Sequence, residues 1–143
     1  MVTEIEMLNC IHQNADMAKD SLEHILPMSA DSAFTKELEK QKAEYARAYQ
    51  KSEALLRERN FEQGKDAPAV TKMMSGVMAK LKNLADPSTE KLAEMVFQGN
   101  NMGISDLSKC INGYQGEDKE VLNLAKKLLA QEEKNAEAMK KFL

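Results

Sequence analysis

Histidine and cysteine, the side chains most often used to bind metals or to act as nucleophiles, are scarce in this sequence, which holds two of each. Cys10 and His12 are both common ligands of soft metal ions. Side chains two positions apart on a helix point to different faces, however, so this pair does not form a site by itself. We interpret His12 as an ordinary residue at the edge of a helix face.

The sequence offers no recognisable catalytic set. A serine or cysteine nucleophile needs a histidine that a third group orients, and neither His12 nor His24 has such a group near it. Many carboxylates stand three positions before a lysine, as in Glu37-Lys40 and Glu39-Lys42, which is typical of a solvated helix surface. We therefore expect a structural or protein-interaction role and not an enzyme.

The composition indicates one globular domain spanning residues 1–143, with 43% hydrophobic and 30% charged residues. A net charge of −3 argues against a nucleic-acid partner, which would require a basic face. No apolar run approaches the length of a membrane span, and the acidic start lacks the apolar core of a signal peptide. These features predict a cytoplasmic protein without a membrane partner.

Apolar residues recur in steps of three and four along most of the chain, which is typical of helices with one buried face. No segment alternates in the manner of a strand, so the chain is predicted to be all-α. Turn signals divide it into five helices. They run from Leu8 to Pro27 and over about 33–60, about 66–84, 88–113 and 118 to the C-terminus.

The four longer helices predict a four-helix bundle. The first pair and the last pair each form an antiparallel hairpin. Between the pairs lie a loop and the shorter third helix, whose roughly 17 residues span about 25 Å, enough to return along the bundle. The expected fold is a four-helix bundle with one long crossover that carries a short extra helix.

Cys10 and Cys110 lie 100 positions apart, without the short spacing of a metal knuckle. We interpret them as two reduced thiols in a cytosolic protein. The alternative is a disulfide formed under oxidation, because the expected topology brings both cysteines toward the same end of the bundle.

Three stretches of the sequence resemble the ferritin-like superfamily, and more narrowly a branch of small bacterial ferritin-like domains of unknown function. They are Ser75–Leu84, Glu94–Asn101 and Val121–Asn135. The resemblance implies a bundle in which a Glu from each of two helices and a Glu-x-x-His from each of the other two hold metal ions.

The resemblance also implies that the metal site of this chain is degenerate. Arg47 follows Glu44, and Asn135 follows Glu132, where the pattern of the family has histidine. Neutral amides do not supply the negative charge that two divalent ions need, so we expect no cofactor. The alternative is an atypical iron or other divalent-metal site, in an oxidoreductase or iron-handling protein. Its candidate ligands are Asp16, Glu44, Asn101, Glu132 and Asn135.

Gln41, Glu132 and Asn135 fall on otherwise apolar helix stripes. Buried polar groups are hydrogen-bonded, so these side chains are expected to meet one another across the bundle. We favour a polar layer that fixes helix register, or side chains that reach solvent. A remnant metal site and a pocket for a small ligand remain alternatives.

Two further groups of residues have both a packing and a binding interpretation. Gly99 and Gly103 predict close packing against Tyr45 or Tyr49, with a pocket beside Gly99 as the alternative.

On the third helix, a methionine-rich apolar face predicts packing on the bundle. Its alternatives are a cuprous-ion site, a partner-docking patch and the seam of a homodimer, and we expect the protein to act as a homodimer joined through this helix or through an open face of the bundle. The methionines are Met73, Met74 and Met78.

Overall fold

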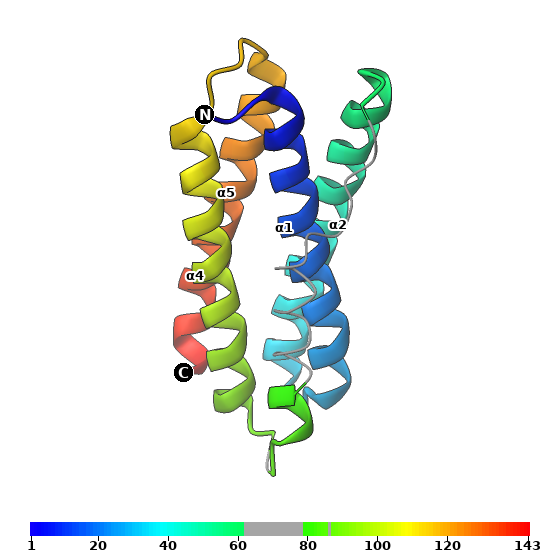
Figure 1. The fold of residues 1–143 in the computed structure, drawn as a ribbon. Helices are drawn as coiled ribbons and strands as arrows, with labels where there is room; N and C mark the ends of the chain where they lie inside the picture. Colours follow the sequence, from blue (N-terminus) through cyan, green and yellow to red (C-terminus); the bar gives the residue numbers. More distant parts are fainter. Residues whose placement is uncertain (62–78, 86) are drawn as a thin grey trace.

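The computed structural model describes residues 1–61, 79–85 and 87–143. Four long helices dominate it, and its described residues confirm the all-α prediction (Figure 1). They are α1 (Glu4–Ile25), α2 (Ser32–Glu58), α4 (Thr89–Gly113) and α5 (Lys119–Met139). Short 3₁₀ turns follow α1 at Leu26–Met28 and α5 at Lys140–Phe142. A short helix α3, helical over the described residues 79–82, lies in the connection between α2 and α4.

The predicted one-crossover topology is confirmed. α1 and α2 are antiparallel neighbours, as are α4 and α5 (Figure 1). α2 ends at one end of the bundle and α4 begins at the other, so α2 and α4 run in the same direction and their connection spans the bundle (Figure 1). Each helix therefore packs beside antiparallel neighbours, and both chain termini lie at the ends of the bundle.

Local signals in the sequence set the helix ends. Ser88 and Asp118 accept hydrogen bonds from backbone N–H groups in the first turns of α4 and α5, close to the predicted starts. α1 begins four residues before Leu8, because Thr3 and Glu6 form a capping box that the apolar stripe does not reveal. At the end of α2, Asn60 takes the left-handed conformation, with φ 56°, that stops a helix.

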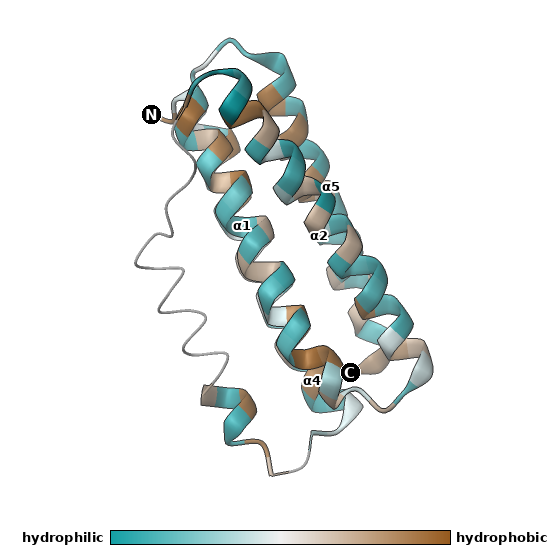
Figure 2. Cartoon of the chain, turned by 90° about the vertical axis from the view of Figure 1, so that its right-hand side faces the viewer, coloured by the Kyte–Doolittle hydropathy of each residue, from teal (hydrophilic) through white to brown (hydrophobic). Residues whose placement is uncertain are grey.

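The apolar stripes become the core, and hydrophilic residues cover much of the outer helix faces (Figure 2). On α2 the residues that recur in steps of four and three are all buried: Phe34, Leu38, Gln41, Tyr45, Ala48, Ser52 and Leu55. α5 likewise buries its stripe from Val121 to Met139. Within the described residues, no helix is long and apolar enough to cross a membrane.

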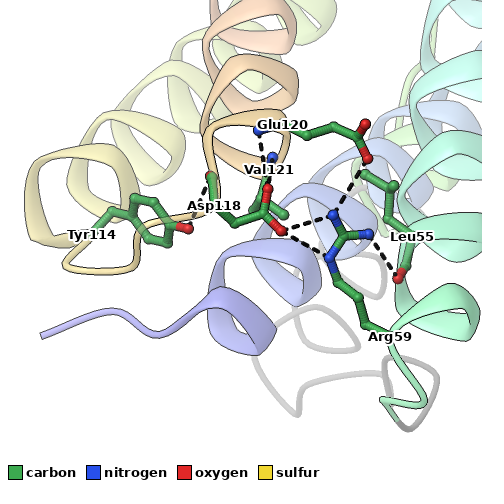
Figure 3. A network of polar contacts seen from close by, with 6 residues as sticks. All are labelled: Leu55, Arg59, Tyr114, Asp118, Glu120 and Val121. Carbon is green, nitrogen blue, oxygen red and sulfur yellow. Dashed lines mark hydrogen bonds and ion pairs between the residues drawn. The ribbon is translucent and has the colours of Figure 1, made fainter.

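The end of the bundle that carries the N-terminus is tied together across the chain. Val2 pairs with Tyr114 in an isolated parallel bridge, in which the Val2 N–H donates to the Gly113 carbonyl at 2.8 Å. Arg59, at the end of α2, reaches Asp118 at the start of α5 through two contacts of 2.7 and 2.9 Å (Figure 3). These contacts join three segments that are far apart in sequence.

The interpretation of Cys10 and Cys110 as two reduced thiols is wrong, because the two residues form a disulfide that joins α1 to α4. Their Cα atoms lie 7.0 Å apart across the helix pair. The alternative of a disulfide at a shared end of the bundle is the one that the structure supports. Free thiols therefore no longer support the predicted cytoplasmic location, since disulfides persist mainly in oxidising compartments.

Candidate ligand-binding site

A layer of buried polar side chains crosses the bundle near its middle, and all four long helices contribute to it. Its members are Asn14 from α1, Tyr45 from α2, Asn100 from α4, and Glu132 and Asn135 from α5. Each is at least nine-tenths buried. A polar group that leaves water needs a protein partner, so the contacts within this layer decide what it does.

The hydroxyl of Tyr45 is the centre of the layer. It donates to the side-chain oxygen of Asn100 at 3.3 Å, and it accepts from the side-chain nitrogen of Asn135 at 3.3 Å. The carboxyl of Glu132 is a further hydrogen-bond partner of the hydroxyl. Burial, together with the nearby Glu132, raises the pKa of Tyr45, which therefore stays protonated and bridges α2, α4 and α5.

Glu132 is a buried acid, with 1% of its surface exposed. Burial raises the pKa of Glu132 to about 8, although the hydrogen bond with Tyr45 acts in the opposite direction. At neutral pH this carboxyl is therefore mostly protonated. Among the described residues, its Oε2 atom has no hydrogen-bond partner.

Glu132 fits into the bundle because Gly103 has no side chain. A Cβ atom added to Gly103 would overlap the carboxyl group of Glu132. The predicted close packing is confirmed at Gly103, where the nearest side chain is that of Glu132. At Gly99 the packing prediction is wrong, because Gly99 is exposed and a Cβ there would meet nothing within 4 Å among the described residues.

A cavity of about 220 Å³ lies between α1 and α4, beside Gly99 as the alternative interpretation of that glycine expected. Most of its wall is apolar, with Met17, Ala18, Leu22 and Ile25 from α1 and Met95, Val96 and Met102 from α4. Asn14, Tyr45 and Asn100 bring the polar layer to the same cavity, and Lys80 also lines it. The cavity thus combines an apolar wall with a small set of hydrogen-bonding groups.

Asn100 connects the cavity to the polar layer. Its oxygen accepts from Tyr45, while its side-chain nitrogen has no hydrogen-bond partner in the described part of the chain. An amide N–H that is buried without a partner is costly, so a molecule that offers an acceptor at this point would gain free energy. Asn100 was not among the residues proposed from the sequence.

The five candidate metal ligands are not brought together. Glu132 and Asn135 are buried in the layer, Asp16 and Glu44 are half-buried, and Asn101 is exposed. The neighbouring Asn100 faces the core instead, so the residue predicted from the sequence is wrong by one position. Among residues 1–61, 79–85 and 87–143, no group of three or more His, Cys, Asp or Glu side chains is placed to hold a metal ion.

Two other expectations need correction. Gln41 is buried as predicted, but its Nε2 donates to Glu37 on its own helix at 3.2 Å instead of joining Glu132 and Asn135. His12 is buried, not an ordinary edge residue, and its ring lies 4.3 Å from the ring of Tyr49. The methionines at 73, 74 and 78 lie outside the described residues.

A signal for the missed residue is present in the sequence. The buried face of α4 follows Val96, Asn100, Gly103 and Leu107, in steps of four, three and four. A stripe through Val96, Gly99, Gly103 and Leu107 also has steps of three and four, so periodicity alone does not decide between Gly99 and Asn100. Comparison with known proteins does not help to decide between Gly99 and Asn100, since no protein-family model, curated protein or solved structure matches this chain.

Proposed function

We propose that this protein binds a small, largely apolar molecule in the cavity between α1 and α4. The observation that carries the proposal is the cavity of about 220 Å³ whose wall includes Tyr45 and Asn100 of the polar layer. Ligand-binding sites in proteins typically have this composition, with an apolar lining that supplies affinity and a few polar groups that orient the ligand.

The size of the cavity limits the ligand. An engineered apolar cavity of about 150 Å³ stays dry and binds benzene. The cavity here, at about 220 Å³, suits a molecule somewhat larger than benzene, such as a substituted ring or a short branched chain. Asn14, Tyr45 and Asn100 line it, and amide and hydroxyl side chains favour binding over catalysis.

The proposal is tested by blocking the cavity. Ala18→Phe places a ring in the cavity wall, while Ala130→Phe, on the exposed face of α5, adds the same ring elsewhere. Ethylbenzene should raise the melting temperature of the wild type and of Ala130→Phe, because a ligand that binds only the native state stabilises it. Ala18→Phe should not respond. An equal response of all three proteins would contradict the proposal.

The protein-interaction role expected from the sequence stays a prediction, as does a homodimer. The methionine-rich surface proposed for it falls outside the described residues. Sedimentation of the wild-type chain over a range of concentrations measures its oligomeric state. A monomer at all concentrations would contradict the homodimer.

Membership of the ferritin-like superfamily and the alternative of an iron or other divalent-metal site also stay predictions. They are tested by thermal unfolding of chelator-stripped protein with Fe(II), Mn(II) or Zn(II) in the absence of oxygen. A stabilisation that Glu132→Ala abolishes would support the metal alternative. An unchanged melting temperature with every ion would contradict it.

A further inference from the structure

The hydrogen bonds of Tyr45 determine what the cavity can offer to a ligand. A tyrosine hydroxyl has one proton to donate and two lone pairs with which to accept. Here the proton is directed to the Asn100 oxygen, the Asn135 nitrogen donates to one lone pair of the hydroxyl, and the protonated carboxyl of Glu132 is the partner at the other. The oxygen of Asn100 is therefore engaged, and the nitrogen is the part of its amide that remains without a partner.

Asn14, the other asparagine of the cavity wall, also has its amide oriented by a hydrogen bond. The side-chain nitrogen of Asn14 donates to the backbone carbonyl of Gly103 at 3.5 Å, and an amide nitrogen carries a second N–H besides the one used there. Both asparagines of the cavity wall thus have N–H groups to offer. The complement of such a wall is a ligand that accepts hydrogen bonds.

The environment of the layer also limits the charge of that acceptor. The acid of the polar layer, Glu132, has its pKa raised mainly by burial, which indicates that this part of the bundle disfavours negative charge. The cation that lines the cavity, Lys80, is exposed and stands on α3, whereas Asn100 is buried on α4. A neutral acceptor is therefore better suited than a carboxylate to the position beside Asn100.

We propose that the cavity selects small apolar molecules that carry a neutral carbonyl group, and that Asn100 donates to this carbonyl and determines the selectivity. This inference rests on the proposed function, since it requires that the cavity be occupied by a ligand. It adds the chemical class of the ligand, namely compact ketones, aldehydes or esters. It also names Asn100 as the residue that donates a hydrogen bond to the carbonyl oxygen.

The test compares three probes of one skeleton by calorimetric titration. Acetophenone carries the carbonyl, ethylbenzene replaces it by CH₂, and benzoate replaces it by a carboxylate. The wild type should bind acetophenone more tightly than either of the others. In Asn100→Leu the ratio of the acetophenone and ethylbenzene affinities should fall at least tenfold, because a site built to donate a hydrogen bond discriminates through that bond.

Matched variants keep this result interpretable. Asn101→Leu, one position along α4 and exposed, should leave the ratio unchanged. If Asn100→Leu does not fold, Tyr45→Phe is the second variant, since it removes the hydrogen bond that orients the Asn100 amide, and it should lower the ratio as well. Circular dichroism and the melting temperature check the fold of each protein.

The outcomes separate the inference from the proposed function. A ratio that is the same in the wild type, Asn100→Leu and Tyr45→Phe would overturn the role of Asn100 while ethylbenzene binding still supports an apolar site. Tightest binding of benzoate would overturn the neutral class. Failure of both ethylbenzene and acetophenone to bind the wild type would overturn the proposed function itself.

Discussion

Glu132 on α5 occupies the space that the missing side chain of Gly103 leaves on α4. This relationship allows a carboxyl group to be buried at the middle of the bundle, beside the hydroxyl of Tyr45. Tyr45 belongs to the polar layer and also lines the cavity, so the layer adjoins the cavity wall. The stability of the protein and the proposed ligand site therefore depend on the same few side chains.

Gly99 and Gly103 of α4 should respond in opposite ways to alanine. Gly103→Ala places a methyl group against the Glu132 carboxyl and should lower the free energy of unfolding by about 1–3 kcal/mol. In the part of the chain that the structure describes, the methyl group of Gly99→Ala meets nothing within 4 Å, so this change should raise the free energy of unfolding by up to about 1 kcal/mol, because alanine is the better helix former. Denaturant unfolding measures both values.

A double variant isolates the contact with Glu132. In a Glu132→Ala background the methyl group of Gly103→Ala has space, so its cost should largely disappear. If Gly103→Ala costs the same in both backgrounds, the carboxyl is not what excludes the side chain.

The buried acid should make stability fall as pH rises. The pKa of Glu132 is about 8 in the folded protein against an ordinary value of 4.5, so the folded state holds the proton more strongly. Its contribution is complete below about pH 4.5 and is lost as pH rises to about 8, with a slope of about 1.4 kcal/mol per pH unit.

The measurement is the difference in free energy of unfolding between the wild type and Glu132→Gln over pH 4–9. Glutamine keeps the shape of the side chain and cannot ionise, so its stability should exceed that of the wild type increasingly toward pH 8. Glu133→Gln, at an exposed position next along α5, is the control and should show no such trend. A difference that is constant with pH would contradict a buried, titrating Glu132.

The disulfide should contribute strongly to stability. Cys10 and Cys110 are separated by 100 positions, and a closed loop of this length restricts the unfolded chain considerably. Reduction, or the double variant Cys10→Ser with Cys110→Ser, should lower the free energy of unfolding by about 2–5 kcal/mol. Denaturation with and without reductant measures the loss, and the double variant should be insensitive to reductant. Equal stability of oxidised and reduced protein would contradict the expected contribution.

Asp118 has two roles that substitutions can separate. It caps α5, and it pairs with Arg59 from α2 (Figure 3). Burial acts to raise the pKa of Asp118, but the hydrogen bonds from Arg59 and from backbone N–H groups outweigh it and hold the pKa below its ordinary value. This contribution is therefore present at neutral pH and is lost as pH falls through that lowered pKa.

Asp118→Asn keeps a capping side chain and removes the charge, so it should cost about 0.2–1 kcal/mol. Asp118→Ala removes both and should cost about 1–2 kcal/mol. Thermal unfolding at neutral pH in low and high salt distinguishes the roles, since salt should reduce only the charge-dependent part. Equal losses for the two variants would assign the whole effect to the ion pair.

The periodicity of the sequence was sufficient to predict the helices, the core faces of α2 and α5 and the single crossover. Long stripes with steps of three and four constrain the orientation of a helix over many turns, so one ambiguous position matters little. On α4 the stripe is interrupted by two glycines and two adjacent asparagines, and there the sequence pointed to Asn101 instead of Asn100. Gly99, Asn100 and Asn101 themselves carry no large apolar side chain, so the spacing could not fix the rotation of the helix at this point.

Contacts between helices were decided by the tertiary structure. The distances between the four helices decide which hydrogen-bond partners are reached by Gln41, Glu132 and Asn135. The spacing of residues along one helix does not contain this information. The same is true of the pairing of Cys10 with Cys110 and of the cavity, which is the space left where α1 and α4 face each other with Gly99 and Ala18 between larger side chains. The sequence by itself determined which faces turn inward, because burial of apolar surface acts on each helix separately. Only packing of the four helices determined which polar groups meet and where a space remains, because both depend on side chains brought together from distant parts of the chain.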